Sequence, residues 1–481
     1  MPPADSEFFA ALADVVFSNP FSAKRAALIA RLAPGAKPGD LTEDPEALAR
    51  LVAPRLAPWM SKRLADEERR LIEPALLYVT YHRYVPRIDA HIERQAKQGG
   101  APLVVPFAEE VLSDFVENGF SADAAARYLA LYFQLRRAFY FIYRSLAGEC
   151  ESMQRLREAL WNNVFTHDMR GYDAALWHRM EDFSTLLLGE TGTGKGQAAA
   201  AIGRSGFIPY LPAERRFAAN FAETFIAINL SQFPESLIES ELFGHRKGAF
   251  TGAIDHHEGV FERCSAHGAL FLDEIGEVSV PIQIKLLQVL QERTFTPLGG
   301  REKRRFSGRV IAATNQPPDS LRRDFFYRLC SDVIHMPTLR QRIAESDGEL
   351  PELVRILVER ITGSRELVDK VLESLPKGHA WPGNVRELEQ AVRRILLTGR
   401  YTPEVGTTHL DEDAVLVEKL RAGELTAAEL LARYSAMLHR RLGTYAEVAK
   451  RTGLDPRTTR KYIDGASAKN RGQSPISHSG S

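Results

Sequence analysis

Hydrophobic and polar positions follow two different patterns along this chain. From residue 1 to about residue 160, apolar side chains recur at three- and four-residue spacing, which predicts a mainly helical region. Ser121 is placed to cap one such helix, whose apolar face would carry Ala124, Tyr128, Leu131, Leu135 and Phe139. Loops are expected at residues 33–44 and 98–106.

The pattern changes at Ser184. Short β-rich runs at residues 185–188, 225–229, 269–272 and 309–313 are set between helical segments. This alternation predicts an α/β core, a parallel sheet with helices on both faces. After Pro337 the chain is expected to be helical again to about Thr398. A polar stretch at 399–408 then leads to a small helical unit and a disordered tail.

Composition narrows the class of protein. A chain of 481 residues is expected to form two to four domains, and 44% apolar with 26% charged residues is typical of a globular protein. Lys and Arg together number 62, as do Asp and Glu, so any basic surface must be local. The distant Cys150, Cys264 and Cys330 fit no ligand spacing. With no leader and no apolar run long enough to span a membrane, a cytoplasmic protein is expected.

A glycine-rich segment follows the first β-rich run and opens an alanine-rich helix. It comprises Gly189, Glu190, Thr191, Gly192, Thr193, Gly194 and Lys195. In this setting the backbone N–H groups, the helix N-terminus and Lys195 can surround phosphates, so the segment predicts a nucleotide site. Gly196 stands where a phosphate loop usually has the Ser or Thr that ligates Mg²⁺. It leaves the cradle intact and makes the helix start more flexible.

Two further strands are expected to end in polar groups. Asp273 and Glu274 close the apolar run at 269–272, where Asp273 is placed to hold Mg²⁺ and Glu274 to position the attacking water. Asn315 follows the run at 309–313 and is a candidate sensor of the γ-phosphate. Arg322 and Arg328 lie six residues apart on a polar helix; on their own they fit a solvated surface better than a site.

One motif settles the resemblance. The segment ELFGHRKGAFTGA at 241–253 resembles the signature of sigma-54-dependent transcriptional activators, ring-forming ATPases of the AAA+ class. The flanking segments PESL at 234–237, LDEIGE at 272–277 and WPGNVREL at 381–388 agree with it. The resemblance covers about residues 184–398 and recurs at the C-terminus.

The resemblance implies roles for individual residues. Lys195, Asp273 and Glu274 would bind and hydrolyse ATP with Mg²⁺, and Asn229 would restrain Glu274 until the γ-phosphate is sensed. Arg322 and Arg328 would reach into the neighbouring subunit's site as arginine fingers, and Arg386 would contact nucleotide from a helical lid. The family's rings are hexamers, so self-association is implied, and most members have a glutamate where this chain has Gly196.

The hallmark hexapeptide is intact and comprises Gly248, Ala249, Phe250, Thr251, Gly252 and Ala253. Gly248 and Gly252 can adopt backbone angles closed to other residues, which suits a hairpin that moves with nucleotide state. Phe250 would be an apolar anchor on the sigma-54 factor of RNA polymerase holoenzyme, with Thr251 offering a hydroxyl. The spacing alone fits a tight turn with Phe250 packed inward equally well.

The C-terminal region has the pattern of a helix-turn-helix. Thr444 and Glu447 form a capping-box sequence, Gly453 allows a turn, and Asp455 can cap a second helix that begins at Pro456. It resembles the Fis-type domain of these activators, and between residues 439 and 471 nine Lys and Arg stand against three acids. A double-stranded DNA partner is therefore expected, with contacts from Arg457, Thr458, Arg460 and Lys461.

These predictions define six segments. They are a helical regulatory domain at 1–160, the α/β ATPase subdomain at 161–340, the lid at 341–402, a linker at 403–424, the helix-turn-helix at 425–466 and a disordered tail at 467–481. The interpretation that fits best is an activator that binds upstream DNA and uses ATP to remodel the closed sigma-54 polymerase complex. The alternatives are a repressor with a degenerate ATPase and an AAA+ remodeller of unrelated clients.

The N-terminal region has no motif for a signal. His82, His91 and Glu93 are conceivable metal ligands, but solvated or core positions fit them better. A set of aromatic residues is expected to form a helical core or a dimer face rather than a small-molecule pocket; it comprises Tyr128, Tyr132, Phe133, Phe139, Tyr140 and Tyr143.

Overall fold

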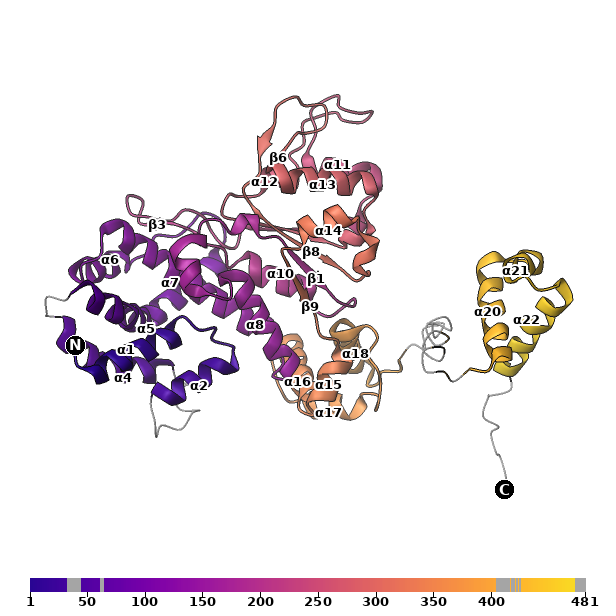
Figure 1. The fold of residues 1–481 in the computed structure, drawn as a ribbon, viewed down its shortest axis with the longest axis horizontal. Coiled ribbons are helices and arrows are strands. Elements are labelled where there is room, and N and C mark those ends of the chain that lie inside the picture. The colour runs from indigo at the N-terminus through magenta and orange to yellow at the C-terminus, as the bar shows by residue number, and fades with distance from the viewer. Residues whose placement is uncertain are drawn as a thin grey trace, which may run out of the picture. The chain divides into compact units, whose positions relative to one another are not determined.

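The computed structural model describes residues 1–32, 45–60, 65–403 and 425–471, together with Leu416, Leu420 and Gly423. It divides into two compact units, Met1–Tyr401 and Thr402–Ser481 (Figure 1). Within these described stretches, no helix combines the length and the apolar character that crossing a membrane requires.

The first part of the larger unit is helical, which confirms the sequence prediction for the described residues. Its helices are α1 (Pro3–Val16), α2 (Ala23–Leu32), α4 (Pro45–Met60), α5 (Asp66–Gln98), α6 (Ala108–Glu117), α7 (Ala122–Ser145), α8 (Glu151–Phe165) and α9 (Met169–Gly171). Ser121 caps α7 as predicted, because its hydroxyl accepts a hydrogen bond from the Ala124 N–H at 3.2 Å. The loop expected at 98–106 begins after α5, and the loop expected at 33–44 lies outside the described residues.

A five-stranded parallel sheet forms the centre of the unit, with the order β4-β5-β8-β1-β9. The strands are β1 (Thr185–Leu188), β4 (Phe225–Asn229), β5 (Ala269–Asp273), β8 (Arg309–Thr314) and β9 (Asp332–His335). All four predicted runs are strands. The edge strand β9 was not predicted, because its four residues include Asp and His and show no apolar run. Two short hairpins pair β2 (Tyr210–Leu211) with β3 (Arg216–Phe217) and β6 (Thr294–Phe295) with β7 (Arg304–Arg305).

Helices cover both faces of this sheet, as the alternating pattern predicted. They are α10 (Lys195–Gly203), α11 (Glu235–Phe243), α12 (Val260–Arg263), α13 (Val280–Glu292) and α14 (Arg323–Leu329), with short helical turns η1 (Tyr172–Leu176), η2 (Met180–Asp182), η3 (Leu230–Gln232), η4 (Ile275–Glu277) and η5 (Pro318–Ser320). Successive strand residues point to opposite faces. Leu186 and Leu188 therefore join the core with α11, α13 and α14, whereas Leu187 joins the core with α7, α8 and α10.

The N-terminal helices are thus one layer of the same unit. The expected boundary at residue 160 falls inside α8, which runs beside the sheet from the N-terminal helices toward the lid (Figure 1). Arg137 of α7, fully buried, donates hydrogen bonds to the carbonyls of Arg204 (2.5 Å) and Gly206 (2.7 Å) just beyond α10. Its guanidinium also lies 4.5 Å from the centre of the Phe133 ring. Backbone carbonyls and an aromatic face therefore compensate a charge that burial would otherwise make costly.

Four helices after β9 form the lid, as predicted for the chain beyond Pro337. They are α15 (Leu339–Glu345), α16 (Glu349–Thr362), α17 (Val368–Ser374) and α18 (Asn384–Thr398). The turn between α7 and α8 is attached to them. Arg342 and Glu349 form a buried ion pair, Arg342 donates to the Ala147 carbonyl at 2.6 Å, and the Glu149 N–H donates to Glu349 at 3.1 Å.

The smaller unit contains α20 (Ala427–Leu442), α21 (Tyr445–Thr452) and α22 (Pro456–Arg471). Its predicted caps are present: Thr444 accepts from the Glu447 N–H, and Asp455 accepts from the N–H groups of Arg457 (2.9 Å) and Thr458 (3.0 Å). Gly453, with φ of 71°, ends α21 in the left-handed region. The second helix runs to Arg471, past the predicted end at 466, since alanines at 466 and 468 favour helix.

The N-terminal aromatic residues are mostly core. Tyr128, Tyr132 and Phe133 are buried, and only Tyr143 is half exposed. His91 is also a core residue, surrounded by the rings of Phe107, Phe133 and Phe217. The His82 ring instead contacts the rings of Tyr78, in a tilted arrangement, and Tyr81, edge to face, and the exposed Glu93 pairs with Arg144, so these three candidate metal ligands are not brought together.

Burial of His91 predicts an acid-sensitive fold. Burial lowers the pKa of its imidazole from 6.5 to about 4, because the charged form loses its water. The unfolded chain therefore binds the extra proton first as pH falls below 6.5, and stability decreases with decreasing pH. Acidification from pH 7.5 to pH 5 should cost about 2 kcal/mol through this residue. Urea unfolding of His91→Leu should show a loss smaller by that amount; an equal loss in both proteins would contradict the assignment.

Candidate nucleotide site and contact loop

The glycine-rich segment connects β1, which lies between β8 and β9, to α10 and forms an open backbone loop. Gly192 and Gly194 adopt φ of 82° and 97°, angles that L side chains avoid, and α10 begins at Lys195. The Lys195 ammonium donates to the carbonyls of Gly189 (2.8 Å) and Glu190 (3.2 Å), which places it over the loop. Backbone N–H groups, a helix N-terminus and a cation thus converge where phosphates would bind.

Parallel pairing brings the predicted polar strand ends to the same edge. Asn229 of β4 lies in register with Asp273 of β5, and β8 leads into Asn315, whose amide donates to the Thr191 hydroxyl at 3.2 Å. Glu274 follows Asp273 with φ of 55°, an uncommon angle for a glutamate that turns the chain sharply at the strand end. Four chain segments predicted separately therefore meet at one site.

The charges of this site influence one another. Burial lowers the pKa of the Lys195 ammonium, and the carboxylates of Glu274 and Asp273 oppose that change. Burial raises the pKa of the Glu274 carboxyl, and Lys195 opposes it in turn. Arg386, on the lid helix α18, contributes to both groups. The set combines hard carboxylate oxygens, which suit Mg²⁺, with cations that suit phosphate.

Asn229 has a different partner from the expected Glu274. The Asn229 amide oxygen accepts hydrogen bonds from the backbone and hydroxyl of Ser231, at 3.0 and 2.8 Å. Among the described residues, Glu274 Oε2 is buried without a hydrogen-bond partner. Asn229 therefore does not hold Glu274 in this structure, and no described residue bonds to Glu274 Oε2.

The two candidate finger arginines, Arg322 at the N-cap of α14 and Arg328 in its last turn, bond within their own protomer. Exposed Arg322 pairs with Asp324 at 2.8 Å, and Arg328 donates to the Leu290 carbonyl at 2.8 and 3.1 Å. Neither bonds to residues 189–195 of its own chain. Gly196, in the first turn of α10, has space beside it, because an added Cβ would meet only the Phe271 ring at 3.9 Å.

The hexapeptide at 248–253 forms a closed loop, here called the contact loop. The Gly248 N–H donates to the Ala253 carbonyl at 2.8 Å, and the Ala253 N–H donates to the Phe250 carbonyl at 3.0 Å. Gly248 and Gly252 have φ of 79° and 104° with open space around them, so backbone angle rather than crowding requires glycine. Phe250 is 37% exposed with its ring edge on His245, an arrangement between the two predicted ones.

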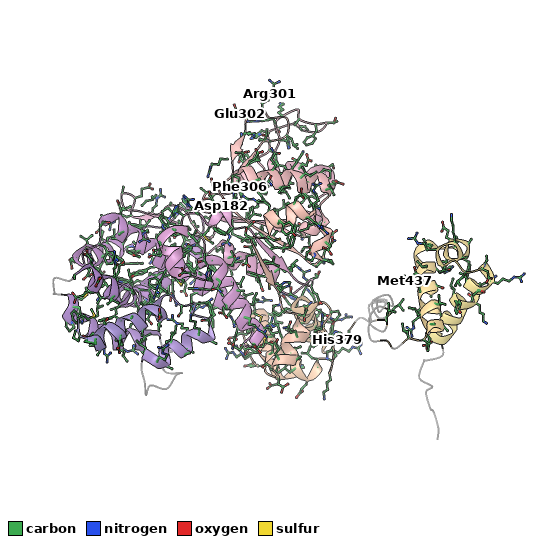
Figure 2. The ribbon with its side chains drawn as sticks, in the orientation of Figure 1. Asp182, Arg301, Glu302, Phe306, His379 and Met437 are labelled. Carbon is green, nitrogen blue, oxygen red and sulfur yellow. The ribbon has the colours of Figure 1, made fainter. Side chains whose placement is uncertain are left out.

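A second loop supports the contact loop and was not predicted. The Leu298 carbonyl accepts from the Arg246 N–H at 2.9 Å, and a Cβ on Gly299 would lie 2.8 Å from the Ala249 side chain. Figure 2 shows Arg301 and Glu302 of this β6–β7 loop at the outer end of the larger unit. Short β-pairs have little sequence signal, so only the structure reveals this support.

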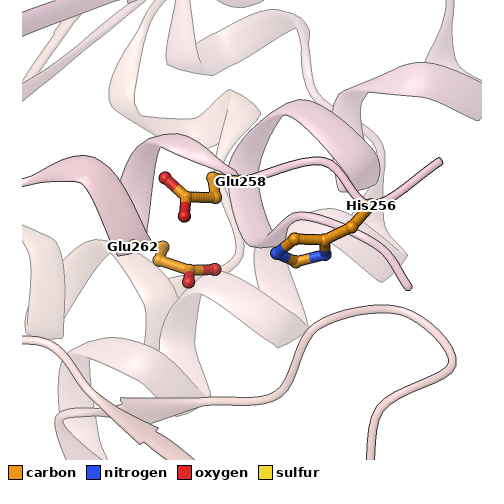
Figure 3. Close-up of side chains that lie close together, drawn as sticks. All are labelled: His256, Glu258 and Glu262. Atoms are coloured by element: carbon orange, nitrogen blue, oxygen red, sulfur yellow. The ribbon is translucent and has the colours of Figure 1, made fainter. Parts of the chain in front are cut away.

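Three potential metal ligands, His256, Glu258 and Glu262, lie together beside the contact loop (Figure 3). His256 Nδ1–H donates to the His245 carbonyl at 2.9 Å, and Glu262 forms an ion pair with Arg304 of β7. Since two members already have protein partners and His256 and Glu258 are exposed, we assign no metal to this group. The Glu262–Arg304 pair joins α12 to β7, and the His256 bond joins the two segments that flank the contact loop.

The smaller unit presents the predicted DNA contacts on α22. Arg457, Arg460 and Lys461 are exposed and Thr458 is half-buried at the start of this helix. Arg460 lies over the Tyr445 ring of α21 and 3.6 Å from Asp464. The helix pair thus exposes three cations on one face of its second helix.

The sheet order, the phosphate loop after β1, the acidic end of β5 and the helical lid together define an ATPase core of the AAA+ class. Residues 171–335 match the model of the Sigma-54 interaction domain. The predicted resemblance to sigma-54-dependent regulators is confirmed over these residues.

Similar proteins agree with this assignment. The chain is 42% identical over 220 residues to a Nif-specific regulatory protein of Azotobacter vinelandii, covering 44% of this chain and 39% of that protein. It is 39% identical over 246 residues to the DNA-binding transcriptional regulator NtrC of Rhizobium meliloti, covering 49% and 47%. It is 40% identical over 227 residues to the sigma54-dependent transcriptional regulator SfnR of Pseudomonas fluorescens, covering 45% of this chain and 57% of that protein. The chain therefore spans about half the length of the curated relatives it matches.

Proposed function

We propose that this protein is a sigma-54-dependent transcriptional activator. It binds upstream double-stranded DNA, assembles into a ring, and couples ATP hydrolysis to remodelling of the closed complex of sigma-54 RNA polymerase. The observation that carries the proposal is an intact contact loop, with Phe250 partly exposed, in the same compact unit as the phosphate loop and the acidic end of β5. A cytoplasmic location follows from these partners.

Roles in hydrolysis are assigned by position. Lys195 and the loop amides would bind the phosphates of ATP, and Arg386 would approach them from the lid. Asp273 would hold Mg²⁺, which neutralises phosphate charge when bound. The free oxygen of Glu274 would orient the attacking water, with Asn315 near the phosphate loop as sensor.

Arg322 and Arg328 would complete the site of a neighbouring protomer. Both bond within their own chain away from the phosphate loop, which supports a role in trans. A ring, hexameric by resemblance, would place each α14 against the next subunit. Asn229 would exchange its Ser231 contacts for Glu274 in another nucleotide state.

DNA binding would reside in the smaller unit. The exposed cations at the start of α22 support phosphate and base-edge contacts in a major groove, as expected for the second helix of a helix-turn-helix. The N-terminal helices would regulate the ATPase, since they cover one face of its sheet and contact its lid.

The contact loop provides the decisive test. Thr251 is exposed and no described residue bonds to its side chain, so Thr251→Ala should leave ATPase activity and DNA binding intact. Sigma-54-dependent transcription should fall at least ~10-fold, which corresponds to a loss of about 1.4 kcal/mol or more of interaction free energy. Transcription would be measured in vitro with sigma-54 holoenzyme on a supercoiled template. Asp255→Ala, exposed just outside the loop, is the matched control. Retained transcription in Thr251→Ala would refute the contact.

A further inference from the structure

The lid is attached to the phosphate loop by a network of side-chain hydrogen bonds that the sequence pattern does not predict. Asn384, the first residue of α18, is fully buried and adopts φ of 53°. Its amide N–H groups donate to Glu190 Oε2 and to the Thr191 carbonyl, both at 3.1 Å. Its amide oxygen accepts from the Leu339 N–H at 2.8 Å. One side chain thus joins the phosphate loop to the start of two lid helices.

Glu190 is the loop's partner in this network. Both of its carboxylate oxygens accept from the guanidinium of Arg340 on α15, one of them at 2.9 Å. These bonds are the main reason that the pKa of Glu190 lies below its usual value. A carboxylate in a phosphate-binding loop would repel phosphates. Paired with Arg340 and Asn384, it is neutralised and faces the lid, so its role differs from that of the surrounding glycines.

The backbones of loop and lid are also in direct contact. The Val385 N–H donates to the Gly192 carbonyl at 3.1 Å, and a Cβ on Gly192 would lie 2.2 Å from the Gly383 carbonyl. That same Cβ would lie 3.0 Å from Cβ of Arg386. Any shift of the loop backbone around a phosphate must therefore move the base of Arg386, or break these contacts.

We propose that Glu190, Arg340 and Asn384 are positioning residues that form a latch, through which the phosphate loop sets the position of the lid and of Arg386. The inference rests on the proposed function, in that the loop binds ATP. The latch closes when loop and lid are in register, and it delivers Arg386 to the nucleotide.

Helix α15 extends the latch to the N-terminal region. Arg340 bonds to Glu190 of the phosphate loop. Arg342, two residues later, donates to the Ala147 carbonyl and pairs with Glu349. A displacement of the α7–α8 turn would therefore move α15, and with it the Arg340 side chain that is bonded to Glu190.

The test uses the exposed pair, because Asn384 is buried and its replacement risks misfolding. Glu190 and Arg340 are 39% and 52% exposed. Glu190→Gln, Arg340→Gln and the double variant of the full chain would be titrated with a fluorescent non-hydrolysable ATP analogue. Each single variant should bind about 3- to 10-fold more weakly, the range of a partly exposed bidentate pair. The double variant should bind no more weakly than either single one.

Turnover separates positioning from general damage. The KM for ATP should rise by the same factor while kcat changes less than about two-fold, because Lys195, Glu274 and the fingers are untouched. Glu389→Gln is the control, since this α18 carboxylate also has two arginine partners, Arg360 and Arg393, but both lie within the lid and not on the phosphate loop. Additive losses in the double variant, or losses equal to those of the control, would overturn the latch. Absence of binding by the unaltered protein would instead refute the proposed ATPase.

Discussion

Glu274→Gln is expected to bind ATP as well as the unaltered protein does while hydrolysis falls by ~10²–10⁴-fold, the contribution of a positioned acid–base group. The structure gives the reason. Glu274 follows β5 at an unusual backbone angle, and its free Oε2 is buried near Lys195. Glutamine keeps the shape but cannot accept a proton from water. Burial raises the pKa of this carboxyl, so it takes up a proton at a higher pH than an ordinary glutamate does. As the pH is lowered, the activity of the unaltered protein should therefore begin to fall at a higher pH than an ordinary glutamate would give.

The measurement is steady-state phosphate release beside equilibrium binding of nucleotide. Glu277→Gln is the matched control: it lies three residues on, and its carboxylate accepts from the Gln316 amide at 2.6 Å. It should hydrolyse ATP normally. Loss of nucleotide binding in Glu274→Gln would mean that the residue holds the site together instead of positioning water.

Arg322→Ala should lower hydrolysis by ~10³-fold or more, the scale of an arginine finger in GTPases. The side chain contributes little to its own protomer, since its pair with Asp324 is exposed, and its backbone N–H bond to Gln283 survives the change. Arg323→Ala, the exposed neighbour, should be nearly silent. Arg328→Ala is a less clean test, because its bond to the Leu290 carbonyl joins α14 to α13.

Mixing two inactive variants tests whether the finger acts in trans. Arg322→Ala retains Glu274, and Glu274→Gln retains Arg322, so a ring containing both has some sites with every group present. Phosphate release should reappear on mixing and depend on the ratio of the two proteins. No recovery, with ring assembly verified by sedimentation, would contradict a finger supplied by the neighbour.

Much of the site follows from local sequence. A phosphate loop needs glycines, a lysine and a strand-to-helix setting, and all three are contiguous between residues 185 and 203. The acids at 273 and 274 and Asn315 end apolar runs, and parallel strands place their ends along one edge. Local sequence therefore predicts the phosphate loop and these strand ends, as it predicts the caps at Ser121, Thr444 and Asp455.

Other features depended on contacts distant in the chain. Glu190 pairs with Arg340, 150 residues away in the chain, and with Asn384, 194 residues away, and no periodicity in the sequence indicates either contact. The β6–β7 loop under the contact loop and the edge strand β9 are too short to show a pattern. The engagement of Asn229 with Ser231 is a choice between nearby partners that its residue type leaves open.

By itself, the sequence determined the chemistry: which residues can bind phosphate, hold a cation or anchor a partner, because those capacities depend on residue type and short-range order. Only the tertiary structure decided how the parts are connected. It made the N-terminal helices one layer of the ATPase unit and placed Arg340 and Arg342 on one helix between the N-terminal turn and the phosphate loop. The physical reason is that burial of the sheet face and neutralisation of Glu190 both require groups that approach only when the whole unit has folded.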